Sequence, residues 1–223
     1  MNLPALQEQL RSLRLGHFSQ ALEQQQSHVT TYAEMSFEER LGLLAQHEIL
    51  CRQNTKIKRL VTQAKMRLDA HASHIDYRAA RGLRKDKVAT LLSGQYLHYA
   101  HNIIITGATG CGKTYLACAL GQHACGQHHT VKYYRLGQLL DELNIGHADG
   151  SYRQQLALLA KKNLLILDDW GMEKLSTRQA NDLLDVMEDR YQNASTIIAS
   201  QIPVADWYKL ISNPTIADAL LDR

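Results

Sequence analysis

Apolar residues recur along the chain in two patterns, and the pattern changes near residue 100. From Leu3 to Leu15 they recur every three or four positions, which is the spacing of a helix with one buried face. After residue 100, short uninterrupted apolar runs such as 103–105 alternate with segments of helical spacing. Because an uninterrupted run suits a strand covered on both faces, the second part predicts a parallel α/β sheet flanked by helices.

The first hundred residues predict a small, mostly helical region. Ser36-Phe37-Glu38-Glu39 has the S-x-x-E form of a capping box, which opens a helix to about Leu50. If that helix continues, its basic residues follow one another at steps of three or four and share one face beside an apolar stripe. The basic residues of this face are Arg52, Lys56, Arg59 and Arg67. Such a face is either simply solvated or contacts the phosphate backbone of DNA, and we expect the second.

The pattern divides the chain into three parts. Residues 1–75 form the helical N-terminal domain, residues 76–101 a linker with an entry helix over 86–92, and residues 102–223 the core. The expected strands are 102–106, 130–134, 164–168 and 196–200; the expected helices of the core, besides one that begins at Lys113, are 136–143, 152–161 and 177–191. Strands and helices in this alternation predict a doubly wound sheet.

A glycine-rich segment follows the first expected strand. Residues 107–114, GATGCGKT, match G-x-x-x-x-G-K-[ST], a loop whose backbone N–H groups surround a phosphate chain at the start of a helix. Lys113 is expected to contact the β- and γ-phosphates, and Thr114 to bind Mg²⁺ through its hydroxyl. The expected nucleotide-binding residues are Gly107, Ala108, Thr109, Gly110, Cys111, Gly112, Lys113, Thr114 and Tyr115.

A second signal for nucleotide chemistry lies downstream. In NLLILDDWG, residues 163–171, four apolar residues lead into Asp168 and Asp169. The carboxyl ends of parallel strands are where such sheets bind ligands, so both carboxylates are expected beside the phosphates. Mg²⁺ prefers carboxylate oxygen, which assigns Asp168 to the metal and Asp169 to the attacking water. The two motifs together predict an ATPase that uses ATP and Mg²⁺.

Charge and composition narrow the class of protein. The formal net charge is only +3, but residues 52–87 hold eleven basic and three acidic side chains. None of the apolar runs approaches the roughly 20 residues that span a bilayer, and no leader opens the chain, so we expect a cytoplasmic protein with no membrane partner. The four cysteines and eleven histidines lack the spacing of a zinc site or a disulfide framework.

Four stretches carry a resemblance to a known family. GATGCGKT, LLILDDWG, DLLDVMEDRYQNASTIIASQIP and ADALLDR resemble IstB, the helper ATPase encoded beside the transposase in bacterial insertion sequences. That family is similar to the DnaC and DnaI helicase loaders and belongs with DnaA among the AAA+ ATPases. The resemblance implies an AAA+ P-loop core, and it spans about residues 3–223, most specifically from residue 102 onward.

The resemblance also implies further site residues. The sensor I position falls on Gln201 or, alternatively, Ser200, and the arginine finger acting on a neighbouring subunit falls on Arg223, with Arg190 as the alternative. Two departures stand out: Ala108 replaces a common proline, and Asp169 replaces the usual glutamate, which implies slow hydrolysis. The helical lid of the family, with its sensor II arginine, is not among residues 102–223.

The family's segment between the second and third strands carries a helix that touches DNA. By resemblance, this segment offers Tyr152, Arg153, Lys161 and Lys162 as contacts. The function implied is an ATP-dependent protein that forms a ring or helical homo-oligomer on duplex DNA and assists its IstA-like transposase. The alternatives are a helicase loader of the DnaC or DnaI type, a small-molecule kinase and a nucleotide-gated scaffold that does not hydrolyse ATP.

Overall fold

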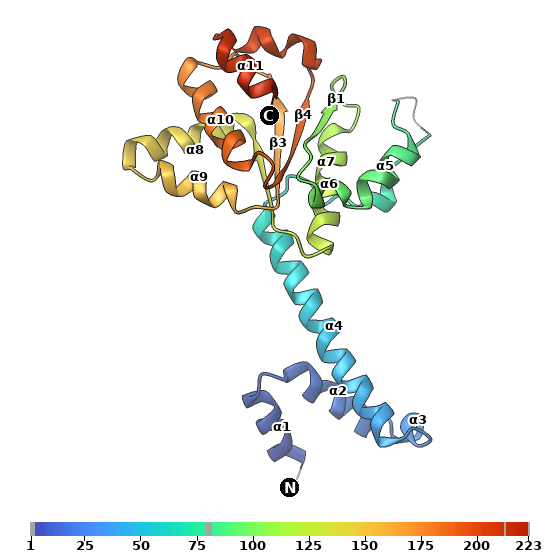
Figure 1. Cartoon of the computed structure of the whole chain (residues 1–223). Coiled ribbons are helices and arrows are strands. Elements are labelled where there is room, and N and C mark those ends of the chain that lie inside the picture. Colours follow the sequence, from blue (N-terminus) through green and yellow to red (C-terminus); the bar gives the residue numbers. More distant parts are fainter. Residues whose placement is uncertain (1–2, 79–81, 212, 223) are drawn as a thin grey trace. The chain divides into compact units, whose positions relative to one another are not determined.

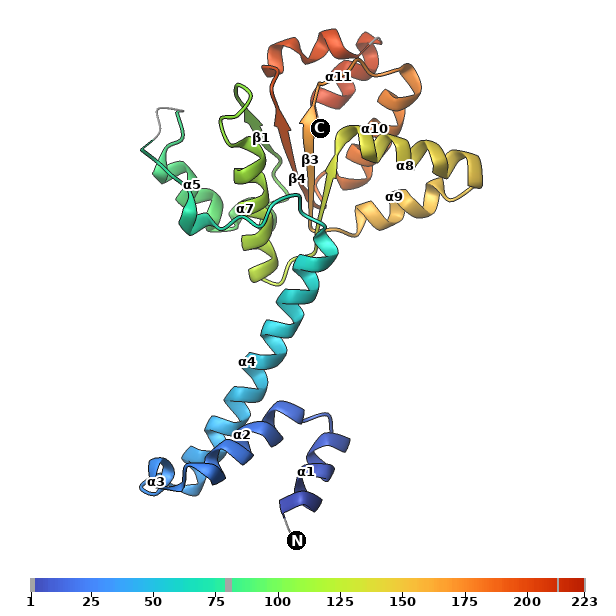
Figure 2. The same cartoon turned by 180° about the vertical axis from the view of Figure 1, so that it is seen from behind.

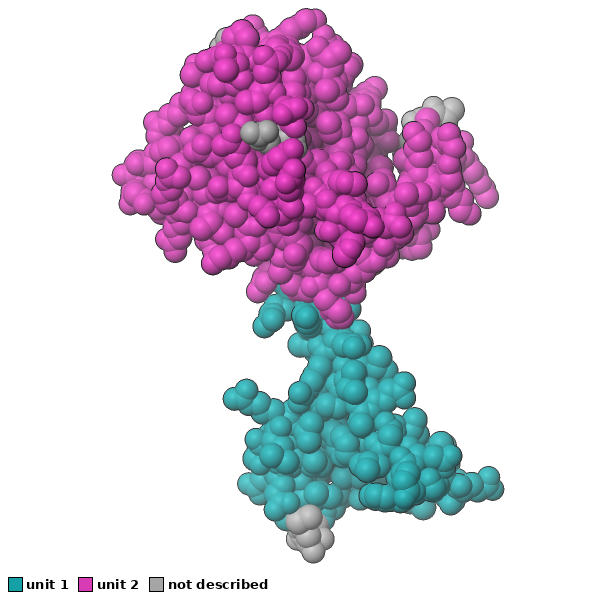
Figure 3. All heavy atoms as spheres, in the orientation of Figure 1, with its two compact units in different colours: residues 1–59 teal, residues 60–223 magenta. Residues whose placement is uncertain are grey.

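A computed structural model describes residues 3–78, 82–211 and 213–222. The chain forms two compact units, unit 1 over residues 1–59 and unit 2 over residues 60–223 (Figure 3). This boundary differs from the expected domain limit at residue 75. Leu60, Ala64 and Ala70 are buried in the core of unit 2, so the residues just before position 75 belong to the packing of the nucleotide-binding unit.

Unit 1 is helical, as expected. Its elements are α1 (Leu3–Ser12), α2 (Gly16–Ser27), α3 (Val29–Tyr32) and the greater part of α4 (Phe37–Ala64), labelled in Figure 1. The predicted capping box at the start of α4 is present: Ser36 Oγ accepts from Glu39 N–H at 3.2 Å, and Glu39 Oε2 accepts from Ser36 N–H at 2.8 Å. The α2 helix was not anticipated.

The end of α4 corrects the predicted basic face. The helix stops at Ala64, and Lys65 takes a left-handed backbone conformation with φ of 52°. A left-handed residue ends an α-helix, so the backbone leaves the helical path before Arg67. Arg67 therefore does not share a helical face with Arg52, Lys56 and Arg59.

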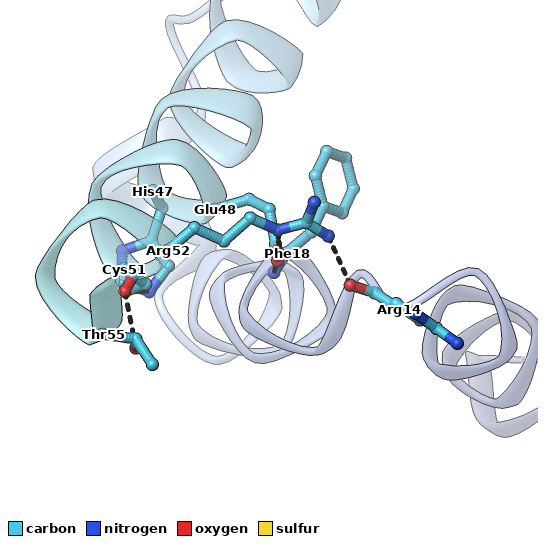
Figure 4. Close-up of polar contacts among 7 residues, drawn as sticks. All are labelled: Arg14, Phe18, His47, Glu48, Cys51, Arg52 and Thr55. Atoms are coloured by element: carbon cyan, nitrogen blue, oxygen red, sulfur yellow. Dashed lines mark hydrogen bonds and ion pairs between the residues drawn. The ribbon is translucent and has the colours of Figure 1, made fainter. Parts of the chain in front are cut away.

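Arg52 makes two polar contacts within unit 1, and its side chain is 55% exposed. Its Nε donates to Glu48 Oε1 at 2.6 Å, and its Nη2 donates to the carbonyl oxygen of Arg14 (Figure 4). Glu48 also accepts from Phe18 N–H at 2.7 Å. Burial raises the pKa of Glu48, but these hydrogen bonds from Phe18 and Arg52 outweigh burial, so the pKa lies below its ordinary value. The Arg52 guanidinium thus links α4 to the segment between α1 and α2, and its contact with DNA stays a prediction.

Unit 2 contains the sheet and the helices around it. Its elements after α4 are η1 (Ala72–His74), α5 (Lys85–Leu92), α6 (Gln95–His98), β1 (Ile103–Thr106), α7 (Lys113–Gly126), β2 (Val131–Arg135), α8 (Leu136–Asp149), α9 (Tyr152–Ala160), β3 (Leu164–Trp170), α10 (Thr177–Arg190), β4 (Ser195–Ser200), η2 (Val204–Leu210) and α11 (Pro214–Asp222). Each expected strand and helix of the core is present; most ends shift by one or two residues, but α8 runs six residues beyond its expected end at Leu143.

The four strands form one parallel sheet in the order β1-β4-β3-β2. Alternate residues of β3 pack on opposite faces: Leu164 and Ile166 face the cluster around α7, while Leu165 and Leu167 face the cluster around α8, α9 and α10. The two views of the ribbon show α7 on one face and α8 to α10 on the other (Figure 2). The fold is therefore α/β, a parallel sheet with helices on both faces.

Arg190 is a buried structural residue of unit 2. Its guanidinium donates to the carbonyl oxygens of Leu159, Lys162 and Ser195 and to the hydroxyl of Thr196, and the residue is 1% exposed. Burial lowers the pKa of Arg190 to about 10, which leaves it charged at neutral pH. The alternative of Arg190 as the arginine finger is wrong, because every donor group named here is already used within the chain.

Candidate nucleotide-binding site

The glycine-rich loop and the two aspartates meet in one cleft of about 400 Å³. The loop follows β1, and the aspartates end β3, so both motifs lie at the carboxyl edge of the parallel sheet. This edge is where open α/β sheets bind ligands. The cleft is lined by Arg67, Leu68, Thr109, Gly110, Gly112, Lys113, Thr114, Tyr115, Asp168, Asp169, Ala199 and Gln201.

The glycines of the loop have identifiable conformational roles. Gly110 and Gly112 have φ of 78° and 93°, values that L side chains adopt rarely. Gly107 has a different constraint, because an added Cβ would lie 2.8 Å from Cys111 Sγ. The loop therefore needs glycine at all three positions, and α7 begins directly after it with its free N–H groups at the cleft.

The side chains of Lys113 and Thr114 make the polar contacts at the end of the loop. Lys113 Nζ donates to the carbonyl oxygens of Gly107 and Ala108 at 2.8 and 2.9 Å. Thr114 Oγ1 donates to Asp168 Oδ2 at 2.7 Å, which joins the first turn of α7 to the end of β3. The pair that the sequence assigned to Mg²⁺ is thus brought together by the fold.

Asp168 is held by donors on several sides. Besides Thr114, the hydroxyl of Tyr133 donates to Oδ2 at 2.8 Å, and the N–H of Asp169 donates to Oδ1 at 2.9 Å. The pKa of Tyr133 is raised, first by burial and then by this bond to the carboxylate. Sequence reasoning missed Tyr133, although a tyrosine near the end of the neighbouring strand β2 is a usable signal.

Asp169 differs from Asp168 in backbone and in surroundings. Its backbone is left-handed, with φ of 56°, at a register shift between β3 and β4. This irregular backbone interrupts the alternation of side chains between the two faces of the sheet. The carboxylate is 32% exposed and lies in the cleft, with Oδ2 at 3.5 Å from Arg67 Nη1. An accessible carboxylate at this position suits the water-orienting role predicted for it.

The two sensor I candidates are separated by their contacts. Ser200 is fully buried, and its hydroxyl bonds to the backbone of Trp170 and Ile202. Gln201 lines the cleft, where its Oε1 accepts from Thr109 Oγ1 at 2.6 Å. Of the two residues, Gln201 is the one with a side chain beside the phosphate loop.

A second, larger pocket of about 690 Å³ adjoins the loop. It shares Gly112, Lys113 and Tyr115 with the cleft and extends along β1 toward α5. Ile103, Ile104 and Ile105 of β1 line it together with Ile75, Val88 and Leu91. Its lining also includes polar residues, among them His74, Asp76 and Lys87. A pocket with apolar walls and some polar groups, continuous with the cleft at the phosphate loop, suits a planar base.

The remaining predicted residues are distributed over the chain. Tyr152 packs within unit 2: its hydroxyl donates to Asp185 at 2.7 Å and its ring stacks on His147 at 3.8 Å. Lys56, Arg59 and Arg153 are exposed, and Lys161 and Lys162 follow α9. Arg223 lies outside the described residues. Within the described ranges, three or more His, Cys, Asp or Glu side chains do not gather into a possible metal site.

Comparison with known proteins adds a family and a fold. The sequence model of the family described as IstB-like ATP binding protein matches residues 8–223. The chain is 44% identical over 196 residues to a Pseudomonas fluorescens protein named as an ATP-binding protein of insertion sequence IS1162, covering 87% of this chain and 84% of that one.

Among solved structures, DnaI matches with a TM-score of 0.58 at 18% identity, over 74% of this chain and 87% of its own. The DnaC helicase loader matches with a TM-score of 0.54 at 20% identity, over 61% of this chain and 82% of its own. At these identities the structural likeness supports the fold alone. In the part of the chain that the structure describes, helices long and apolar enough to cross a membrane are absent.

Proposed function

Because this chain belongs to the IstB-like ATP-binding protein family, we propose that it binds and slowly hydrolyses ATP, and that ATP controls its assembly on duplex DNA. The observation that carries the nucleotide part is the 2.7 Å bond between Thr114 and Asp168. It places the hydroxyl of the loop and the carboxylate of β3 in one cleft, as phosphate and metal binding require.

The chain's donor set fits Mg²⁺. A threonine hydroxyl and a buried carboxylate are hard oxygen ligands, and Mg²⁺ in nucleotide sites takes only one or two protein ligands besides phosphates and water. Thr114 and Asp168 would hold the ion. Bound Mg²⁺ supplies positive charge against the phosphate oxygens.

The roles of the other residues follow from their positions. Lys113 binds the β- and γ-phosphates through its ammonium group, and the N–H groups of residues 108–114 surround the phosphate chain. Asp169 orients a water whose oxygen attacks the γ-phosphorus; the bond to the bridging oxygen breaks, ADP leaves with the electron pair, and the proton of the water passes to Asp169 or phosphate. Gln201 lies on the loop side of the cleft, where it can contact the γ-phosphate.

The DNA-binding part of the proposal rests on exposed basic residues. Lys56 and Arg59 lie one turn apart on α4, and Arg153 lies at the start of α9. Phosphate contacts of this kind give affinity with little sequence preference. A homo-oligomer of ring or helical form, with Arg223 acting on a neighbouring subunit, would couple nucleotide binding to DNA binding and present the DNA to the partner transposase.

The nucleotide proposal is tested by two variants. Lys113→Ala removes the phosphate-binding cation, and we expect ATP binding measured by calorimetry to weaken at least about 100-fold. Asp169→Asn keeps the shape of the side chain, so ATP still binds while phosphate release slows at least about tenfold. If Lys113→Ala binds ATP as the parent chain does, the loop is not the nucleotide site.

The DNA proposal is tested by sedimentation of the full chain with duplexes of increasing length under ATP, ADP or no nucleotide. We expect large assemblies only with both ATP and duplex. Lys56→Ala with Arg59→Ala should weaken binding and lower the slope of log K against log salt by about 2. The matched control is Arg178→Ala with Lys209→Ala, which removes the same charge from unit 2.

Two outcomes would contradict the DNA proposal. A chain that remains monomeric and ignores DNA while consuming ATP would favour a small-molecule kinase. An equal loss of DNA affinity in the Arg178 and Lys209 control would show that net charge, and not the face on α4, determines binding.

A further inference from the structure

Arg67 is a second cation in the nucleotide cleft, beside Lys113. It lines the same cleft as the phosphate loop, and its Nη1 lies 3.5 Å from Asp169 Oδ2. We propose, resting on ATP binding at this loop, that Arg67 is a ligand of the terminal phosphate within its own subunit. On binding ATP it exchanges Asp169 for phosphate oxygens and so releases Asp169 to act on water.

The position of Arg67 is fixed by the backbone around it. Residues 66–71 lie along α7, the helix that begins at Lys113. Ala70 N–H donates to Gln122 Oε1 at 3.2 Å, and the Tyr115 hydroxyl donates to the carbonyl oxygen of His71 at 3.2 Å. Arg67 and Lys113 both line the cleft, so a phosphate bound by Lys113 would lie in the same cleft as the Arg67 guanidinium.

The packing of the same segment against α7 is close. An added Cβ on Gly121 of α7 would lie 3.0 Å from Met66 Sδ. The thiol of Cys118, also on α7, is buried, and burial raises its pKa; hydrogen bonds from the backbone of Leu68 and Arg67 partly offset that rise. Met66 and Leu68, the residues on either side of Arg67, thus both lie against α7. The Arg67 side chain is therefore the part of this segment that can change its contacts.

Arg67 interacts with the Tyr133 side chain and forms an ion pair with Asp169, and the ion pair is the contact that a phosphate can replace. The ion pair has side chains 49% and 32% exposed and a single long contact, so solvent screens it and it is weak. A phosphate offers more charge and two oxygens in the geometry that a guanidinium fork accepts. The exchange is therefore favourable when a terminal phosphate lies in the cleft.

The other carboxylate of the site shows why Asp169 is the residue affected. Asp168 is 1% exposed and accepts from Thr114, Tyr133 and the Asp169 N–H. Oδ2 of Asp168 already accepts two hydrogen bonds and Oδ1 accepts one, whereas Asp169 keeps a more accessible carboxylate. While Asp169 Oδ2 faces the Arg67 guanidinium at 3.5 Å, that oxygen is not available to accept a hydrogen bond from water. Release by Arg67 therefore makes water activation conditional on the γ-phosphate.

The first experiment compares ATP with ADP by calorimetry on the full chain in Mg²⁺. For Arg67→Ala we expect ATP affinity to fall about 10- to 100-fold and ADP affinity less than about threefold. Arg67→Lys should recover part of the ATP affinity, because it keeps the charge without the fork. Arg178→Ala, an exposed arginine of α10, is the matched control and should leave both affinities unchanged.

The second experiment is a double-mutant cycle. Asp169→Asn removes the competing carboxylate, so it should tighten ATP binding about two- to fivefold more in the parent chain than in Arg67→Ala. Equal tightening in both backgrounds, or equal loss of ATP and ADP affinity in Arg67→Ala, overturns the proposal.

Lys113→Ala separates this inference from the nucleotide-binding proposal. If Lys113→Ala loses ATP while Arg67→Ala keeps the parental ratio of ATP to ADP affinity, only the role of Arg67 is refuted. If Lys113→Ala still binds ATP as tightly as the parent chain, the loop assignment and the role of Arg67 fail together.

Discussion

Unit 1 and unit 2 differ in the kind of contact that stabilises the interior of each. Unit 2 has apolar clusters on both faces of its sheet, and strand residues such as Ile166 and Leu167 are completely buried. In the described residues of unit 1, the buried apolar side chains are Ala21 and Leu44, and buried polar residues, Ser19, Gln25 and Glu48, are at least as numerous. Unit 1 therefore depends on hydrogen bonds and ion pairs more than on a core.

That difference bears on what each unit can do. A closely packed sheet holds loop and strand ends in fixed positions, which a phosphate site requires. Unit 1 instead exposes large apolar side chains, with Phe37 73%, Leu13 68% and Val29 66% exposed. Helices with few buried apolar contacts open locally at low free energy. We expect unit 2 to unfold cooperatively and unit 1 to open in parts.

The largest effect is expected at the buried arginine of unit 2. Arg190→Met removes this donor from the carbonyl oxygens of Leu159, Lys162 and Ser195, of which Leu159 keeps the N–H of Lys162 as a donor. The other two acceptors, at about 1–3 kcal/mol each, predict a loss of about 2–6 kcal/mol. Denaturant unfolding followed by tryptophan fluorescence measures it, because Trp170 and Trp207 both lie in unit 2.

Arg178→Met on the same helix is the control for that measurement and should change unfolding by less than about 0.5 kcal/mol. If the two arginine variants have the same free energy of unfolding, the carbonyl oxygens that Arg190 binds must find other donors. The interior of unit 2 would then tolerate the loss of a buried polar group, and the contrast with unit 1 would be smaller.

A smaller effect is expected at the buried glutamate of unit 1. Glu48→Gln weakens the bonds to Phe18 N–H and Arg52, which predicts a local loss of about 1–3 kcal/mol. Amide hydrogen exchange in α2 and the first half of α4 should detect it, corrected for the intrinsic effect of pH. Glu23→Gln, at an exposed position of α2, should leave exchange nearly unchanged.

The same glutamate gives unit 1 a dependence on pH. Because the folded pKa lies below the reference value of 4.5, ionised Glu48 stabilises the fold above about pH 4.5, and this stability is lost as the pH falls through the folded pKa. Glu48→Gln should remove that part of the acid sensitivity. Identical acid profiles for the parent and Glu48→Gln chains would contradict it.

The smallest effects compare two capping boxes of the same chemistry. Ser36 caps α4 in unit 1, and Ser176 caps α10 in unit 2 with a reciprocal bond to Gln179. Each change to alanine should cost about 1 kcal/mol. Ser176→Ala should shift the tryptophan transition, whereas Ser36→Ala should only speed exchange at the start of α4. A shifted tryptophan transition in Ser36→Ala would mean that the units unfold together.

Much of unit 2 could be predicted because its signals are local. The apolar runs of the strands and the loop motif both act through neighbouring residues, and the fold places them as the pattern requires. The carboxyl ends of parallel strands meet at one edge of the sheet, and this rule predicts that the phosphate loop and Asp168 lie close together. The bond between Thr114 and Asp168 agrees with that prediction. Unit 1 lacks such runs, and α2 was missed because no strong periodicity or cap marks it.

The residues that sequence reasoning misplaced depend on single backbone or packing events. Helical spacing predicts that Arg67 lies on α4, because the sequence pattern does not reveal the left-handed backbone of Lys65. The sequence offers Arg190 as the alternative arginine finger, a role that requires an accessible guanidinium. Yet Arg190 follows Ala180, Leu183 and Met187 at helical spacing on the buried face of α10, a signal that was available.

The left-handed backbone of Asp169 limits which substitutions this position accepts. Aspartate and asparagine adopt such φ values more readily than longer side chains do, so a glutamate would introduce strain of about 1–2 kcal/mol unless the main chain also changed. Asparagine, in contrast, fits the same backbone while losing the acid. At position 169, a single exchange of aspartate for asparagine could therefore remove a catalytic carboxylate while keeping the backbone. A glutamate at the same position would require the main chain to take a different path.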